Sequence, residues 1–283
     1  MGVPGGLILA TLAYLLTSSA MSSQTFQDWG WRIPFLASGL VVVVGIVIRV
    51  AIEESPAFKE ANAHQPERMP LMTVLREHRT AVLLIAGGFI AVNSIGYITT
   101  VYVLSYGTTA LQLSRSMLFW CSLAGGLAWL IAVPIASTLV DKRGARGIVT
   151  AASIGLVLGA LILFPLIDTR SPALIAVALV LVSGILGLVY GPLAAVYASA
   201  FPVKVRYSGI SLGYQIGAIL GGGLAPMIAT ALFAASGGSG LITVYLTAIA
   251  VVSLGCLAAL TRRTTYQDEA AAPIEEADAS PAV

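Results

Sequence analysis

Residues 172–198 read PALIAVALVLVSGILGLVYGPLAAVYA and contain no charged residue. A helix that crosses about 30 Å of hydrocarbon needs about 20 apolar residues, so this run is long enough to span a membrane. Strands of membrane barrels alternate apolar and polar residues over about ten positions, whereas this run is continuously apolar. The stretch therefore predicts a membrane-spanning helix.

Runs of this kind occur along the whole chain. Of the 283 residues, 58% are hydrophobic and 10% are charged, whereas an average soluble domain has about 25% charged residues. This composition excludes a soluble globular protein, a disordered chain and a disulfide scaffold. It predicts an all-α polytopic membrane protein with eight spans, of which the other seven cover residues 3–21, 33–52, 81–104, 116–140, 148–167, 208–233 and 241–260.

The polar residues give no sign of an enzyme or of a nucleic-acid-binding protein. A net charge of +2 is too small for nucleic-acid binding. Cys121 and Cys256 lie in apolar runs, where cysteine acts as a small hydrophobic residue. The sequence contains no P-loop, HExxH, CxxC or GxSxG motif, so we expect neither enzymatic activity nor a cofactor or metal ion.

The distribution of Lys and Arg predicts the orientation of the chain in the membrane. The odd-numbered connections contain three of the 15 basic residues, namely Arg32, Arg115 and Arg170. The remaining basic residues lie in the even-numbered connections and the C-terminal segment. Because cytoplasmic loops are enriched in Lys and Arg, we expect both termini to be cytoplasmic.

Two polar segments interrupt or follow the spans. Residues 53–79 form a long connection of mixed charge that contains His64 and His78, and it is expected to join two bundles of helices in the cytoplasm. Residues 263–283 are acidic and rich in Ala and Pro, a composition that predicts a disordered cytoplasmic tail.

Two short basic loops have both a structural and a functional interpretation. The loop after the fourth span contains Asp141, Lys142, Gly144 and Arg146. It is either an ordinary cytoplasmic turn or a gating loop, in which the acid contacts a neighbouring helix N-terminus in one conformational state. The loop before the seventh span contains Arg206 and is either a capped turn or part of the same gate.

The seventh span contains a regular set of glycines. Residues four apart share a helix face, and here they form a small-residue stripe on which another helix can pack closely; the stripe consists of Gly209, Gly213, Gly217 and Gly221. Gly222, Gly223 and Pro226 follow and are expected to weaken the helix, as in the interrupted helices of transporters.

Polar side chains inside the spans are candidates for a binding site. Asn93 and Tyr97 share a face of the third span, and Tyr214 and Gln215 lie in the seventh. Such residues either join helices by hydrogen bonds or line a cavity, since an amide in hydrocarbon needs a polar partner or water. No Asp or Glu lies inside the predicted spans, although a proton relay usually needs an ionisable residue there.

The loop after the fourth span resembles the repeated cytoplasmic motif Gly-x-x-x-Asp-Arg/Lys-x-Gly-Arg/Lys-Arg/Lys of the major facilitator superfamily. Ser137 and Ala145 depart from the motif, and four positions match it: Asp141, Lys142, Gly144 and Arg146. Three further segments resemble the metabolite:proton symporter branch, which includes proline/betaine, shikimate, citrate and α-ketoglutarate carriers; they are residues 30–36, 49–58 and 201–209. Sugar porters are the alternative branch, because they have a similar Glu-Ser-Pro segment.

The resemblance implies a fold of twelve helices in two bundles of six. The eight predicted spans then resemble helices 5–12 of an N-terminally truncated carrier. Residues 1–52 would form the last two helices of the N-terminal bundle, and residues 80–262 the complete C-terminal bundle. The glycine stripe would face helix two, which is missing, and a missing N-terminal half or a second copy would complete the protein.

By the same resemblance, the expected function is secondary active transport in the plasma (inner) membrane. The carrier would move a small polar metabolite, such as an organic acid, amino acid or betaine, together with a proton by alternating access. Its cavity would have aromatic walls and amides that orient a carboxylate or zwitterion, supplied by Asn93, Tyr97, Trp120, Tyr190, Tyr214 and Gln215. The alternatives are an inactive truncated fragment and a non-transporting membrane scaffold.

Overall fold

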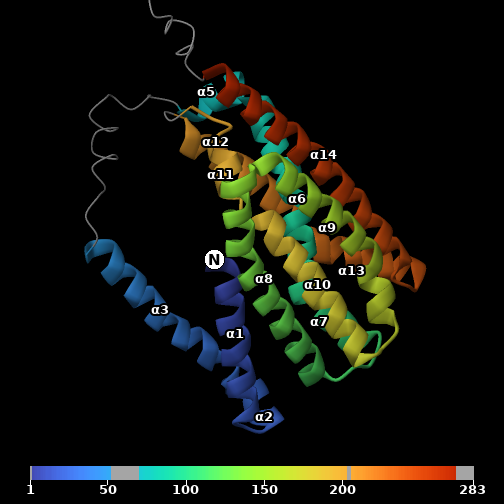
Figure 1. Ribbon diagram of the computed structural model, residues 1–283. Helices are drawn as coiled ribbons and strands as arrows, with labels where there is room; N and C mark the ends of the chain where they lie inside the picture. Colours follow the sequence, from blue (N-terminus) through green and yellow to red (C-terminus); the bar gives the residue numbers. More distant parts are fainter. Residues whose placement is uncertain (1, 52–69, 203–204, 272–283) are drawn as a thin grey trace, which may run out of the picture.

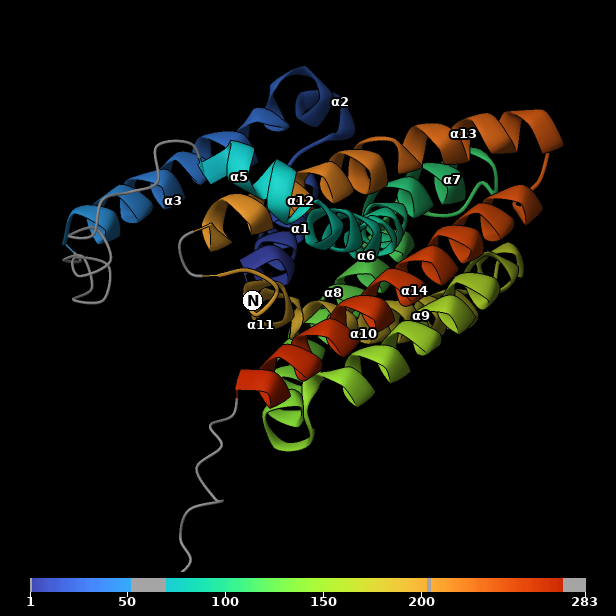
Figure 2. The same cartoon turned by 90° about the horizontal axis from the view of Figure 1, so that it is seen from above.

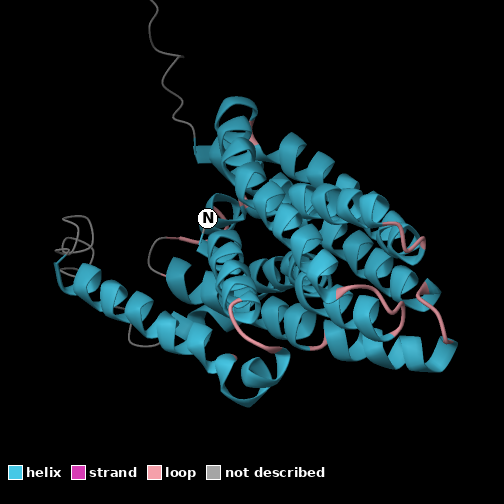
Figure 3. Cartoon of the chain, turned by 90° about the horizontal axis from the view of Figure 1, so that it is seen from below, coloured by secondary structure: helices cyan, strands magenta, loops and turns pink. Residues whose placement is uncertain are grey.

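The computed structural model describes residues 2–51, 70–202 and 205–271, and every secondary-structure element in these ranges is a helix (Figure 3). Eight of the helical segments are long and apolar enough to cross a membrane. The prediction of an all-α polytopic membrane protein with eight spans is therefore confirmed.

The first two spans are built from α1 (Gly2–Ser19), α2 (Ser23–Thr25), the π-helical turn η1 (Phe26–Gly30) and α3 (Arg32–Ala51). A short helix, α5 (Pro70–Glu77), precedes the third span. The other six spans are α6–η2–α7 (Arg79–Tyr97, Ile98–Tyr102, Val103–Thr109), α8 (Arg115–Arg143), α9 (Ala145–Asp168), α10 with α11 (Pro172–Tyr190, Leu193–Ala198), α12–η3–α13 (Arg206–Ala218, Ile219–Gly223, Ala225–Ser236) and α14 (Gly240–Ala271).

The last six spans pack around a common core. Helix α10 lies against α8 and α9, α14 lies against α9 and α6, and α12 lies against α6 (Figure 1). Seen from above, α9 and α14 run side by side (Figure 2). In the same view α7 lies next to α13. Ile95, Phe164 and Leu186 from three of these spans are completely buried. Interdigitated apolar side chains of this kind hold membrane helices together by van der Waals packing.

Glycines allow the closest helix contacts in this bundle. A methyl group on Gly191, which directly follows α10, would lie 2.6 Å from the carbonyl oxygen of Val133 in α8, and one on Gly217 of α12 would lie 2.7 Å from that of Ala86 in α6. Distances this short leave no room for a side chain at either position.

The glycine stripe of the seventh span packs inside the chain. Gly213, Gly217 and Gly221 lie against α6, and Gly209 lies against the ring of Phe201. The expectation that the stripe faces a missing helix is therefore wrong. The four-residue spacing identified the face of the helix that packs, but it contains no information about the partner.

The first two spans have a different environment. Helix α1 lies beside α8, whereas the main neighbours of α3 among the described elements are α1 and η1, and α3 extends away from the bundle (Figure 1). Gly39 and Gly45 of α3 have open space where a side chain would be. Most of the apolar surface of α3 is thus free to meet lipid or another polypeptide.

Three local features differ from the sequence-based expectations or lie outside the described residues. Helix α14 continues to Ala271, so the prediction of a disordered tail from residue 263 is wrong for the backbone up to that point. The rest of the tail, and most of the 53–79 connection with His64, lie outside the described residues. Where Gly222, Gly223 and Pro226 were expected to weaken the helix, the π-helical turn η3 separates α12 from α13, and Pro226 lies in the first turn of α13.

Candidate functional site

Asn93 and Tyr97 of α6 lie directly against the glycine-rich turn η3. A methyl group on Gly222 would lie 2.7 Å from Cε2 of Tyr97 and 3.5 Å from Oδ1 of Asn93, and one on Gly221 would lie 2.9 Å from Cβ of Asn93. The third and seventh spans therefore meet at these two polar side chains. Since π-helical turns are frequent at functional sites, this crossing is the natural starting point for a site.

The amide nitrogen of Asn93 is buried and has no hydrogen-bond partner among the described residues. An unsatisfied buried donor costs about 1–3 kcal/mol, so a protein retains one where another group can accept from it. Asn93 lies near the middle of the third span, Arg79–Thr109. The structure thus leaves one amide donor unsatisfied at mid-membrane depth.

Aromatic side chains from three other spans surround this amide region. The ring of Tyr214 lies 4.0 Å from that of Phe89, and its hydroxyl interacts with Tyr190, with Tyr97 as a further neighbour. Tyr190 in turn meets Trp129 edge-on at 5.8 Å. We call the resulting set, Asn93, Tyr97, Trp129, Tyr190 and Tyr214, the central polar group.

The central polar group draws on four different spans, and its members differ in exposure. Tyr97 is 48% exposed, whereas Trp129 is 6% exposed and its indole nitrogen has no hydrogen-bond partner among the described residues. Trp129 was not among the predicted residues, because a tryptophan in an apolar run is usually a core residue. The available signal was its polar N–H, which needs a partner when buried.

The structure does not bring the other two predicted cavity residues into this group. Trp120 is 59% exposed and lies nine residues before Trp129, which is about 14 Å along α8. Gln215 is exposed on α12, beside Tyr214. The role of all six predicted residues in binding a substrate stays a prediction.

The loop after α8 is a tight turn with exposed charges. Gly144 has φ +79° and its N–H donates to the carbonyl of Val140 at 2.8 Å, which explains the glycine, since this conformation is strained for other residues. Asp141, Lys142 and Arg146 are all exposed, and within the described part of the chain Asp141 has no ion pair. The gating role of this loop stays a prediction.

Arg206 also has a local contact. Its Nε donates to the carbonyl oxygen of Phe201 at 3.3 Å, across the turn that precedes α12. This bond supports the capped-turn interpretation of the loop. Participation of Arg206 in a gate stays a prediction.

An acidic residue lies at the end of a span, contrary to the expectation that the spans contain none. The fifth span ends on Asp168, whose carboxylate accepts a hydrogen bond from the Tyr106 hydroxyl at 2.6 Å and another from the Ser239 hydroxyl. Tyr106 is 5% exposed, so its hydroxyl meets Asp168 inside the bundle. This carboxylate cluster (Tyr106, Asp168 and Ser239) joins the ends of the third, fifth and eighth spans.

Comparison with known proteins settles the family. Residues 5–226, most of the chain, match the Major Facilitator Superfamily. The chain belongs to this superfamily. The resemblance drawn from the loop motifs is thereby confirmed.

Relatives within the superfamily are metabolite transporters. The chain is 34% identical to the inner membrane metabolite transport protein YhjE of Escherichia coli, over 94% of this chain and 62% of that protein. It is 32% identical to the shikimate transporter of Escherichia coli (80% and 53% covered) and 29% identical to the proline/betaine transporter of Salmonella typhimurium (89% and 52% covered). The chain therefore spans about half to three-fifths of the length of these relatives.

A solved structure supports the fold. The chain superposes on the crystal structure of a D-xylose-proton symporter with a TM-score of 0.71 at 14% identity, covering 93% of this chain and 62% of that one. The similarity confirms that the eight spans have the arrangement of part of a twelve-helix superfamily member. At this identity it shows the fold alone.

Proposed function

We propose that this chain forms the solute-carrying part of a secondary transporter that moves a small polar metabolite together with a proton. The observation that carries the proposal is the central polar group, in which four aromatic side chains from four spans lie around the unpartnered amide of Asn93 near the middle of the membrane. Substrate sites of secondary transporters lie at this depth. The transport functions named for the relatives support the same class of activity.

In this proposal four members of the central polar group have a defined task. The amide nitrogen of Asn93 donates a hydrogen bond to a carboxylate or carbonyl of the solute. The rings of Tyr97, Tyr190 and Tyr214 form the wall and hold a compact apolar or cationic body. The π-helical turn η3, which consists mainly of glycine, supplies the local flexibility that alternating access needs.

The proposal also states in which membrane the chain lies and what would complete it as a carrier. The chain is placed in the plasma (inner) membrane with both termini in the cytoplasm, as the distribution of Lys and Arg indicates. The first two spans are assigned to an N-terminal bundle and residues 80–262 to the C-terminal bundle. The exposed surface of α3 supports completion by an N-terminal half or by a second copy. The same exposed surface equally supports the alternative that the chain alone does not transport a solute.

The experiment is solute exchange in proteoliposomes that contain the full chain. Vesicles preloaded with unlabelled shikimate or proline are diluted into the labelled solute, and entry of label is followed without any ion gradient. Wild-type chain is expected to exchange one of the two solutes, and Asn93→Leu is expected to reduce the rate at least tenfold. The matched amide-to-leucine control is Gln24→Leu, at an exposed site outside the central polar group.

Two outcomes would count against the proposal. Absence of exchange by the wild type for both solutes would favour the inactive fragment or scaffold. Equal rates in Asn93→Leu and Gln24→Leu would remove Asn93, and with it the central polar group, from the solute path.

A further inference from the structure

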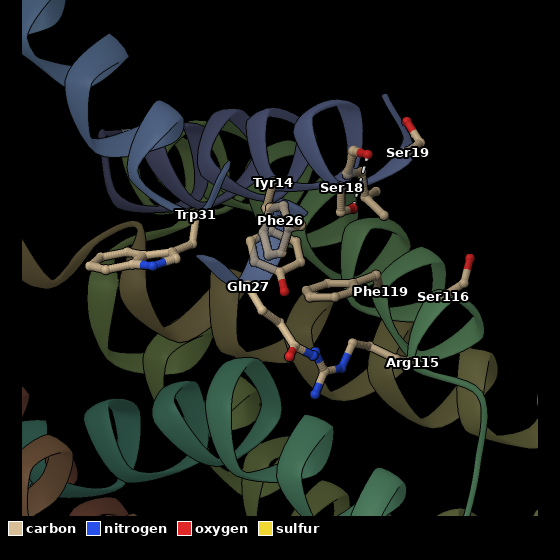
Figure 4. Close-up of a pocket in the computed structure, with 10 residues that line it drawn as sticks. Tyr14, Ser18, Ser19, Phe26, Gln27, Trp31, Arg115, Ser116 and Phe119 are labelled. Carbon is tan, nitrogen blue, oxygen red and sulfur yellow. Dashed lines mark hydrogen bonds between the residues drawn. The ribbon is translucent and has the colours of Figure 1, made fainter. Parts of the chain in front are cut away.

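A cavity lies between the first two spans and the beginning of α8. Its volume is about 630 Å³, within the range of small-molecule sites, and its walls come from α1, η1 and the first turns of α8 (Figure 4). Arg115 lies about 21 Å along α8 from Trp129, because 14 residues separate them. The cavity is therefore distinct from the central polar group.

The polar end of this cavity has an arginine without an acidic partner. The Arg115 guanidinium and the Gln27 amide lie next to each other inside the cavity (Figure 4). Within the described ranges no carboxylate pairs with Arg115. A guanidinium has five donors in a planar fork that matches a carboxylate, and the Gln27 amide adds a donor and an acceptor beside it.

The cavity also has an aromatic wall (Figure 4). The ring of Tyr14 lies 5.0 Å from Phe26, edge-on, and 4.9 Å from Phe119. These contacts hold three rings from α1, η1 and α8 in one wall. Trp31 also lines the cavity, and the Arg32 guanidinium lies 4.4 Å above its ring, which adds a second positive charge nearby.

We propose that this cavity binds a small solute through its carboxylate, which Arg115 and Gln27 receive while the aromatic wall covers the body of the solute. Charge-assisted bidentate pairing with arginine gives both the strength and the geometry of such recognition. The distribution of Lys and Arg places this end of the spans outside the cytoplasm. The cavity is thus an external binding site, reached before the central polar group. The inference goes beyond the proposed function, which it uses only to choose the probe.

The test is a binding titration of the full chain in phosphatidylcholine nanodiscs, followed by tryptophan fluorescence. The probe is shikimate, a carboxylate, and its methyl ester serves as the probe without that charge. Shikimate is expected to give a saturable change that Trp31→Phe removes, and the ester is expected to give none. Arg115→Gln is expected to weaken the affinity at least tenfold, as for loss of a charged hydrogen-bonded pair.

The matched control is Arg170→Gln, which removes the same charge from an exposed residue in another odd-numbered connection. It is expected to leave the affinity within twofold of the wild type. The proposal is overturned if the wild type shows no saturable change, if the ester binds as well as shikimate, or if both arginine variants behave alike. It is also overturned if phosphatidylglycerol nanodiscs abolish shikimate binding, because a lipid headgroup would then be the occupant.

These outcomes separate the external site from the proposed transport function. A change that depends on Arg115 in a chain without solute exchange would leave the site standing and contradict the transport proposal. Solute exchange that depends on Asn93, without any fluorescence change that depends on Arg115, would support the transport proposal and contradict the external site.

Discussion

The second and third spans are both strongly apolar, yet their surroundings differ completely. Mean hydropathy is 2.4 for Phe26–Val50 and 2.0 for Arg79–Thr109, but none of the residues in the apolar window of the former are buried, against 67% in the latter. Hydropathy predicts that both enter the membrane. It does not predict which of them has protein neighbours, because lipid and leucine are equally apolar.

The difference between these spans shows where the fold gets its stability. The third span supplies the surface on which α12 and α14 pack, with glycines and a buried serine at the contacts. Ser253 of α14 donates to the carbonyl of Gly87 at 2.6 Å and accepts from the N–H of Ala91. Helix α3 has no comparable contacts among the described residues. We infer that the last six spans form a self-supporting bundle and that α3 adds little to it.

The largest expected effect contrasts a glycine in each region. Gly217→Val places a branched side chain where the backbone of α6 already lies, and overpacking of this kind costs about 1–3 kcal/mol. Gly45→Val in α3 enters open space and is expected to change the free energy of unfolding by less than about 0.5 kcal/mol. Unfolding of the two variants in a titration with sodium dodecyl sulfate measures the contrast. Equal destabilisation by Gly217→Val and Gly45→Val would contradict the difference in packing between the third and second spans.

The next effect concerns the carboxylate cluster that joins three spans of the bundle. Tyr106→Phe removes the hydrogen bond to Asp168 and is expected to cost about 1 kcal/mol. A double-mutant cycle with Asp168→Asn is expected to give a coupling of about 0.5 kcal/mol or more. The control, Tyr207→Phe, alters a tyrosine that is 85% exposed and is expected to have no effect. Additive effects of Tyr106→Phe and Asp168→Asn would show that the two side chains do not act together.

The smallest effect compares two serines. Ser253→Ala breaks the link between α6 and α14 and is expected to cost about 0.6 kcal/mol, the average for such bonds between membrane helices. Ser38→Ala in α3 removes only a bond to the carbonyl of Phe35 in the same helix and is expected to cost less. The same detergent titration measures both. A larger loss from Ser38→Ala would mean that α3 contributes more than its contacts show.

Much of this fold could be predicted from the sequence because its main signal is run length. Eight long apolar runs give eight spans, and the motif around Asp141 identifies the superfamily. The partner of the glycine stripe could not be predicted, since spacing defines a face but not its neighbour. Asp168 was missed because it lies one residue beyond an apolar run, and only the folded chain brings Tyr106 and Ser239 to it.

The candidate site was partly predictable for a similar reason. Polar residues inside apolar runs stand out, so Asn93, Tyr97 and Tyr214 could be selected. Their convergence with Tyr190 depends on how three spans cross, and the spacing of residues within one span does not encode this crossing. Trp120 and Gln215 are also residues with polar groups inside apolar runs, yet their side chains are exposed.

Proton-driven accumulation tests the central claim most directly. Proteoliposomes containing the full chain are given an acidic exterior, and the internal concentration of labelled shikimate or proline is followed with and without a protonophore. The account predicts that one solute rises above its external concentration and that the protonophore abolishes this accumulation. Entry that only equilibrates the solute, at the same rate with and without the pH gradient, would contradict proton-coupled transport by this chain.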